Sequence, residues 1–240
     1  MVDPGLISNI YEVWEASGFT HGADRIHRQL RREGITVVSV EYRLAPEALY
    51  PAALDDAFAS WEWMSANAAA LGVDPARIAA GGESAGGGIA ASLVQRLHDA
   101  GGRQPVAQWL FAPMLDDRTA GRTELDELDH FVWNNNSNRF GWSSYLGRPA
   151  GAAEVPAYAV PARRSDLTGL APAWLYTGDI ELFHDEIVEY AARLRDAGVD
   201  TVLTIVPGGA HGFENWAATT ELATSLLADA RAWLGDALRG

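Results

Sequence analysis

A serine between glycines, Gly82-Glu83-Ser84-Ala85-Gly86, is the part of this sequence best suited to covalent chemistry. It matches the pattern G-x-S-x-G, which alone is a weak signal. A short apolar segment at residues 77–81 precedes it, and residues 88–98 follow with apolar side chains at helical spacing. Such a strand–turn–helix arrangement forms a nucleophile elbow, because the small flanking residues let the turn close. We therefore expect Ser84 to be a nucleophile. The ordinary alternative is a glycine-rich turn without chemistry.

A serine hydroxyl needs a base, and His211 is the best placed of the six histidines. Most histidines pack or face solvent, but this one follows the β-branched segment Thr201–Val206 in a glycine-rich loop. It should therefore lie beyond the carboxyl end of a strand, where open α/β sheets gather their reactive groups. The helix expected after Ser84 also places the backbone N–H of Ala85 where an oxyanion would form.

A carboxylate must hold the imidazole in the correct tautomer, and it is expected in the loop after the preceding strand. Residues 177–186 contain four acids. The plausible partners of His211 are Asp179, Glu181 and Asp185, and the residue pattern alone leaves the choice among them open.

Strand-like and helical segments alternate along the chain, which predicts a mostly parallel sheet with helices on both faces, of class α/β. Strands are expected at residues 35–40, 77–81, 106–111, 173–177 and 201–206, and helices near residues 54–64, 88–98, 185–197 and 221–238. Residues 116–171 are rich in Asn, Arg, Pro and Gly. Such a long irregular excursion usually lies over a site. We expect one domain over residues 1–240, with an atypical N-terminal segment at residues 1–34.

Composition narrows the function. The 18 Lys and Arg against 32 Asp and Glu give a formal net charge of −14, which disfavours nucleic acid and anionic membranes as partners. The chain lacks cysteine, which excludes disulfides, thiolate catalysis and Cys-ligated metal sites. The first residues carry no basic region followed by a long apolar run, so we expect neither a signal peptide nor a membrane span, and a cytoplasmic location. The Ser-His-acid chemistry needs no metal and no organic cofactor.

The sequence resembles the bacterial hormone-sensitive-lipase-like esterases of the α/β-hydrolase fold. The resemblance runs from about Ser39 to Phe213, and the order Ser, acid, His is the one expected in that fold. Several blocks in the right order carry it: Ser39-Val40-Glu41-Tyr42-Arg43-Leu44-Ala45-Pro46-Glu47, Pro51-Ala52-Ala53-Leu54-Asp55-Asp56, Gly81-Gly82-Glu83-Ser84-Ala85-Gly86-Gly87, Pro113-Met114-Leu115-Asp116-Asp117, Phe140-Gly141-Trp142, Tyr145-Leu146-Gly147 and Ala210-His211-Gly212-Phe213.

The resemblance implies roles for individual residues. The nucleophile of the family corresponds to Ser84 and its histidine to His211. The acid of the family stands in a pattern G-x-x-D-x-x-x-D-E, whose places are filled here by Gly178, Glu181, Asp185 and Glu186. The resemblance thus implies Glu181 as the acid, in place of the usual aspartate. Asp179 is the alternative acid, and Asp185 is expected to have a structural or substrate-side role.

The N-terminal part departs from the family. Members carry a His-Gly-Gly-Gly stretch whose amides supply most of the oxyanion hole, and the corresponding residues here are Glu15-Ala16-Ser17-Gly18. Of these only Gly18 matches, and the loss of one oxyanion donor costs about 3–4 kcal/mol in known hydrolases. The cap and first strands of the family are reduced or missing too. The strand before this stretch normally lies between the strands at residues 35–40 and 77–81. Either residues 9–14 form that strand or the sheet is distorted there.

The main hypothesis is a serine carboxylesterase for short-chain, uncharged esters, with amidase or thioesterase as a related activity. A decayed hydrolase that binds a small molecule is the alternative of another class, and a start inside a longer gene is a third reading. Pocket candidates are Trp133, Trp142 and Phe213, although aromatic residues more often belong to the core. The resemblance implies a homodimer formed through Thr201–Val206.

Overall fold

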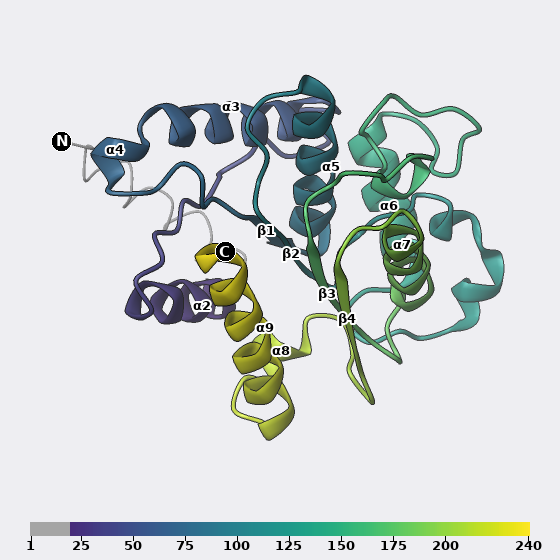
Figure 1. The fold of residues 1–240 in the computed structure, drawn as a ribbon. Helices are drawn as coiled ribbons and strands as arrows, with labels where there is room; N and C mark the ends of the chain where they lie inside the picture. Colours follow the sequence, from purple (N-terminus) through teal and green to yellow (C-terminus); the bar gives the residue numbers. More distant parts are fainter. Residues whose placement is uncertain (1–19) are drawn as a thin grey trace.

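Four parallel strands form the sheet at the centre of the molecule (Figure 1). The computed structural model describes residues 20–240. The strands lie side by side in chain order: β1 (Ala80–Glu83), β2 (Gln108–Phe111), β3 (Ala173–Gly178) and β4 (Thr201–Val206). Glu83 pairs with Phe111, Phe111 with Tyr176 and Tyr176 with Thr204. Because all strands run in one direction, the loops after β1, β3 and β4 emerge at the same edge of the sheet.

Helices cover both faces of the sheet, as predicted. One face carries α3 (Ala52–Ala66), α5 (Ser84–Ala100), α6 (Asn135–Leu146) and α7 (His184–Asp196). The other carries α2 (Thr20–Arg32), α8 (Phe213–Trp216) and α9 (Glu221–Arg239). The remaining short elements are α4 (Ala68–Leu71), η1 (Thr119–Gly121), η2 (Thr123–Glu127) and η3 (Pro161–Arg163).

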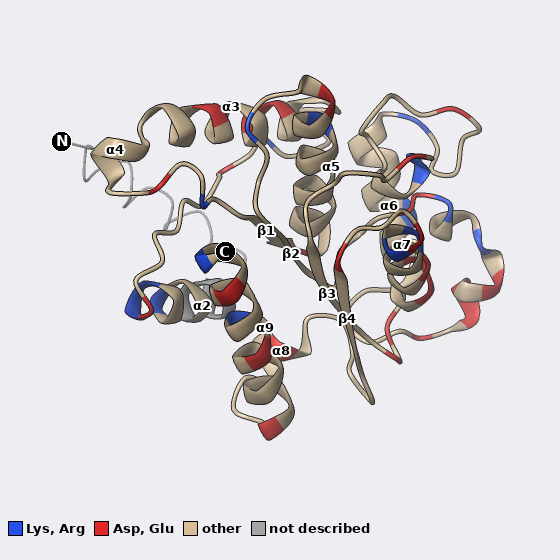
Figure 2. Ribbon diagram, viewed as in Figure 1, with Lys and Arg blue, Asp and Glu red and all other residues tan. Residues whose placement is uncertain are grey.

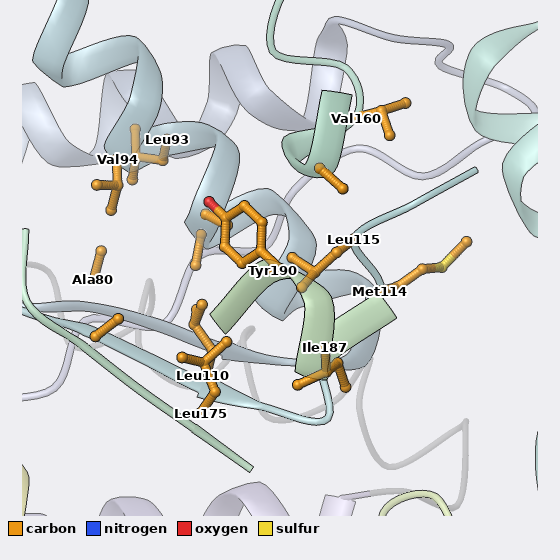
Figure 3. Close-up of a cluster of buried hydrophobic side chains, with 14 of the residues drawn as sticks. Ala80, Leu93, Val94, Leu110, Met114, Leu115, Val160, Leu175, Ile187 and Tyr190 are labelled. Atoms are coloured by element: carbon orange, nitrogen blue, oxygen red, sulfur yellow. The ribbon is translucent and has the colours of Figure 1, made fainter. Parts of the chain in front are cut away.

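Side chains that alternate along the central strands explain the two layers. Leu110 and Leu175 point to the face of α5 and α7, where they are fully buried (Figure 3). The side chains next to these leucines along the strands point to the opposite face, into a second cluster with α9. They are Trp109 and Phe111 in β2, and Trp174 and Tyr176 in β3. Successive side chains of a strand face opposite sides, so strands apolar on both sides require cover on both sides. The core therefore lies in two layers around β2 and β3.

Residues 35–40 do not form the strand that their β-branched run predicts, and that prediction is wrong. The segment carries no helix or strand assignment, and its side chains are half-buried or exposed, with Val38 36% exposed. A strand needs a neighbour for its backbone N–H and C=O groups. Among the described residues, no strand lies between this segment and β1, whose one strand neighbour in that part of the chain is β2. The expected alternative partner, residues 9–14, lies outside the described residues.

The stretch at residues 116–171 is more regular than predicted, because it contains the 12-residue helix α6. The side chain of Asn134 caps this helix by accepting a hydrogen bond from the backbone N–H of Ser137 at 3.0 Å. The rest of the stretch is held by Asp117, which is fully buried. Its Oδ1 lies 2.7 Å from Nε of Arg163, and its Oδ2 accepts from the N–H of Gly151 at 2.9 Å. These bonds tie the start of the stretch to two positions further along it.

Acidic residues are spread over the helices and loops on both sides of the sheet (Figure 2). This distribution agrees with the excess of 32 acids over 18 basic residues. Within residues 20–240, none of the helices combines the length and apolar character that crossing a membrane requires.

Candidate active site

Ser84 stands at the sharp turn between β1 and α5. Its φ of 52° lies in the left-handed region, which is rare for a residue with a side chain and marks a strained position. The turn is tight at Gly82, where a Cβ atom would lie only 2.3 Å from the carbonyl oxygen of Gly86. The backbone N–H of Met114 donates to the carbonyl oxygen of Ser84 at 2.9 Å, which ties the turn to the loop after β2. The first glycine of the pattern, Gly82, is therefore a steric requirement of the turn.

His211 and Glu181 complete a chain of hydrogen bonds with Ser84. Nε2 of His211 lies 2.9 Å from Oγ of Ser84, and Nδ1 lies 2.7 Å from Oε2 of Glu181. The hydroxyl of Thr177 donates to the other oxygen, Oε1 of Glu181, at 2.6 Å. His211 and Glu181 are 7% and 4% exposed, so water competes little for these bonds. The ring of Phe183 packs edge-on against the imidazole, with the ring centroids 5.3 Å apart.

This arrangement suits general-base activation of a hydroxyl. A serine within hydrogen-bond reach of an imidazole, which is itself held by a buried carboxylate, has the geometry of nucleophilic acyl transfer. The three residues come from the loops after β1, β3 and β4, at the edge of the sheet that the sequence predicts. Among residues 20–240, no three His, Asp or Glu side chains are grouped as they would be to hold a metal ion.

One candidate donor for an oxyanion lies at the start of α5. Ala85 is the first residue after Ser84 at the N-terminal end of α5, where backbone N–H groups lack helical partners. Its N–H therefore stands next to Ser84, where the sequence places the expected oxyanion donor. Gly18, the other candidate donor, lies outside the described residues together with Glu15, Ala16 and Ser17.

The other acids of the segment that follows β3 have different partners. Oδ1 of Asp179 accepts a hydrogen bond from the backbone N–H of Gly208 at 2.7 Å, so this side chain supports the loop before His211. Asp185 forms an ion pair with Arg122, at 3.0 Å from Oδ2 to Nη1. Asp185 thereby links α7 to the stretch between β2 and α6. Of the three candidate acids, the structure brings Glu181 alone to the imidazole.

The aromatic pocket candidates divide into two groups. Trp142 and Phe213, each 3% exposed, are core side chains, with Trp142 in the larger cluster and Phe213 in the cluster around α9. Trp133 is half-buried and packs over α6, where a Cβ atom at Gly141 would lie 3.4 Å from its ring and 3.8 Å from the Met114 side chain. Trp133 thus lies beside the residue whose N–H bonds Ser84.

Sequence reasoning missed an exposed aromatic pair next to His211. Trp216 is 53% exposed, and its indole N–H donates to the carbonyl oxygen of His211 at 3.2 Å. The ring of Phe131, from the stretch before α6, lies 5.4 Å from the Trp216 ring. Both residues occur in parts of the sequence without a recognisable pattern, so no local signal could have found them.

Two more carboxyl groups lie near the imidazole, the half-buried Glu83 and the fully buried Glu214. Burial raises the pKa of Glu83, although the hydrogen bond from Asn215 and the charge of His211 act in the opposite direction. Burial and the neighbouring Glu83 raise the pKa of Glu214 to about 8, and the hydroxyl of Tyr176 donates to it. The surroundings of His211 are therefore acidic and shielded from water.

Comparison with known proteins assigns this arrangement to a family. A family model described as alpha/beta hydrolase fold matches residues 16–215. The chain belongs to the α/β-hydrolase fold family. The match confirms the predicted fold and the resemblance stated from the sequence.

This α/β hydrolase is similar to several esterases. It is 36% identical over 191 residues to carboxylesterase NlhH of Mycobacterium tuberculosis. The alignment covers 75% of this chain and 57% of NlhH. It is 30% identical over 224 residues to ethyl acetate hydrolase of Pseudomonas putida, covering 88% and 68%. The solved structure of esterase LipW from Mycobacterium marinum superposes with a TM-score of 0.80 at 38% identity, over 88% of this chain and 66% of LipW. The hydrolase thus spans little more than half the length of NlhH.

The buried carboxyl group of Glu186, in α7, holds the loop after β2 in this α/β hydrolase. That loop bonds the turn at residues 82–86, called the nucleophile turn below. Oε1 of Glu186 accepts from the backbone N–H groups of Leu115 and Asp116, at 2.7 and 3.1 Å, and the hydroxyl of Thr119 donates to Oε2. Leu115 follows Met114, whose N–H bonds Ser84. Burial raises the pKa of Glu186 from its ordinary 4.5 to about 8.

The raised pKa predicts a pH-dependent stability that Glu186→Gln removes. In the unfolded chain the carboxyl group of Glu186 loses its proton near pH 4.5, whereas in the folded state it keeps the proton up to about pH 8. Between these pH values the folded state therefore binds one proton more than the unfolded chain. Over that range the free energy of unfolding falls by up to about 1.4 kcal/mol per pH unit. Glutamine is neutral in both states, so the Tm of the variant relative to the wild type should rise from pH 5 to pH 8. Thermal unfolding at both pH values measures this.

The exposed residue Glu62 on α3 provides the control, because Glu62→Gln should not change the pH dependence. The same Tm difference between Glu186→Gln and the wild type at pH 5 and pH 8 would contradict the raised pKa.

Proposed function

We propose that this α/β hydrolase is a serine carboxylesterase that cleaves short-chain, uncharged esters. The observation that carries the proposal is the continuous hydrogen-bond chain from Ser84 through His211 to Glu181. The similarity to a carboxylesterase and to an ethyl acetate hydrolase supports the ester bond as the target. An uncharged acyl group is proposed because His211 and Glu181 are buried, and a charged substrate group placed beside them would lose its water.

The proposed reaction has two halves. Oγ of Ser84 attacks the ester carbonyl carbon while Nε2 of His211 takes the hydroxyl proton, and Glu181 stabilises the imidazolium through Nδ1–H. The N–H of Ala85 donates to the oxygen of the tetrahedral intermediate. The intermediate collapses to an acyl-serine as the alcohol leaves with the proton from His211. Water then attacks the acyl-serine with His211 as base, which releases the carboxylic acid and restores Ser84.

Hydrolysis and active-site labelling test the proposal together. The purified protein should release p-nitrophenol from p-nitrophenyl acetate, and a fluorophosphonate probe should label Ser84, as located by peptide mass spectrometry. Heat-denatured protein is the control, because an unactivated serine does not react readily. A protein that neither hydrolyses the ester nor takes the label would favour the alternative of a non-catalytic binding protein. Faster cleavage of p-nitroacetanilide or a thioester would assign a different leaving group.

The same proposal includes a homodimer formed through β4. This strand is at the edge of the sheet, and its side chains Val202 and Ile205 are 38% and 45% exposed. Exposed apolar groups on an edge strand favour pairing with another strand. Sedimentation equilibrium measures the association, and a monomer at all concentrations up to 100-fold above the assay would exclude the dimer.

A further inference from the structure

Two hydrogen bonds join the nucleophile turn to the segment that carries the histidine. One is the bond between Oγ of Ser84 and Nε2 of His211, at 2.9 Å. The other runs from Nδ2 of Asn215 to Oε1 of Glu83, at 2.6 Å. Glu83 directly precedes the nucleophile, and Asn215 follows the histidine by four residues. The second bond thus lies beside the first but contains none of the reacting atoms.

The Glu83 carboxylate is also fixed by the backbone next to His211. Gly212 has a φ of +63°, and a Cβ atom there would lie 3.1 Å from Oε1 of Glu83 and 4.0 Å from Nδ2 of Asn215. The carboxylate therefore rests against the Gly212 backbone while it accepts from Asn215. A glycine at this place allows both the left-handed backbone and the close approach of Glu83.

The other hydrogen bonds of the histidine loop lead to a different part of the site. His211 bonds Glu181, and the N–H of Gly208 bonds Asp179, both in the loop after β3. The Ser84–His211 and Glu83–Asn215 bonds both join the turn to residues 207–216. Both bonds therefore help to fix the position of the imidazole relative to the nucleophile turn.

One of the two bonds must be lost during the proposed reaction. When Oγ of Ser84 becomes an ester oxygen, it no longer carries the proton that it shares with His211. The bond from Asn215 to Glu83 contains no reacting atom and persists. In the acyl-serine state it still joins the turn to the histidine segment, at the moment when His211 must activate water.

We propose that Glu83 and Asn215 are positioning residues that hold His211 over the acyl-serine during deacylation. This inference rests on the proposed function, because it assigns a task within the acyl-serine reaction. Their effect should appear in deacylation more than in acylation, since the free enzyme still has the Ser84–His211 bond to align the imidazole. A general structural role would instead slow both half-reactions together.

The test compares the two half-reactions in Asn215→Leu and Glu83→Ala. Loss of a hydrogen bond to a charged group should slow steady-state hydrolysis of p-nitrophenyl acetate about ten- to hundredfold. The second-order rate of fluorophosphonate labelling, which needs acylation chemistry alone, should fall less than about threefold. In stopped-flow experiments the variants should release about one equivalent of p-nitrophenol per site in a burst, followed by the slow phase.

Two variants give the comparison its controls. Asn67→Leu removes an asparagine donor of similar length, the 2.8 Å bond to the carbonyl oxygen of Trp63 at the end of α3, and should leave both rates unchanged. Glu83→Gln keeps an oxygen that can accept from Asn215, so it should restore the deacylation rate to within about threefold of the wild type. Thermal unfolding confirms that each variant is folded.

The outcomes separate this inference from the proposed function. A wild type that neither turns over nor takes the label overturns both. An active wild type whose Asn215→Leu and Glu83→Ala variants lose labelling and turnover equally, or lose neither, overturns the positioning role alone. Glu83→Gln as slow in deacylation as Glu83→Ala would also overturn it.

Discussion

Ser84→Ala is expected to abolish measurable ester hydrolysis, with a loss of at least about 10⁴-fold in kcat/KM. Removal of the nucleophile leaves His211 and Glu181 without a group to activate, and in serine hydrolases it costs as much as removal of the whole triad. The fold should persist, because alanine fits the same left-handed backbone at φ 52° no worse than serine does. Initial rates with p-nitrophenyl acetate, together with loss of fluorophosphonate labelling, measure the effect.

Ser65 on α3 provides the matched control. Its hydroxyl is buried without a hydrogen-bond partner, so Ser65→Ala removes no interaction and should keep full activity. Retention of more than about 1% of the rate in Ser84→Ala would show that another residue carries the covalent step.

Glu181→Ala is expected to lower kcat about 10⁴-fold while the substrate still binds. The imidazole would lose the carboxylate 2.7 Å from Nδ1, which fixes the tautomer with a free Nε2 and stabilises the imidazolium. Asp179 cannot take its place, because its carboxylate is held by the N–H of Gly208 at 2.7 Å. Steady-state kinetics with a short p-nitrophenyl ester separates kcat from KM.

Asp179→Ala serves as the comparison, since Asp179 is the alternative acid. It should lose less than about tenfold, through the loosened loop before His211, because no direct bond to the imidazole is removed. If Asp179→Ala is the slower of the two variants, the assignment of Glu181 as the acid is wrong.

Local sequence patterns predicted those helices and strands whose conformation is determined mainly by their own residues. The β-branched run at Thr201–Val206 forms β4 with the predicted bounds. Helix α7 begins and ends one residue earlier than predicted, and α9 ends one residue later. Residues 35–40 have the same kind of pattern but no strand, because a strand also needs a neighbour that local sequence cannot supply.

The candidate site follows the same division. Ser84, Glu181 and His211 could be found because parallel strands bring their loops to one edge, and because their order along the chain is informative. The bonds of Asn215 to Glu83 and of Trp216 to the His211 carbonyl depend on how α8 packs against the nucleophile turn. A four-residue helix has no periodic pattern, so its contacts could not be predicted. The burial of Phe213 in the core, at the start of α8, could not be predicted for the same reason.

The strained backbone of Ser84 sets stability and activity against each other at one position. A glycine there would adopt a φ of 52° without steric cost, whereas a residue with a side chain is strained by about 1–2 kcal/mol. A screen that rewards heat resistance alone should therefore enrich glycine at position 84 and discard the nucleophile. Libraries built to make this chain more robust must hold that codon fixed, or their most durable members will have lost the hydroxyl.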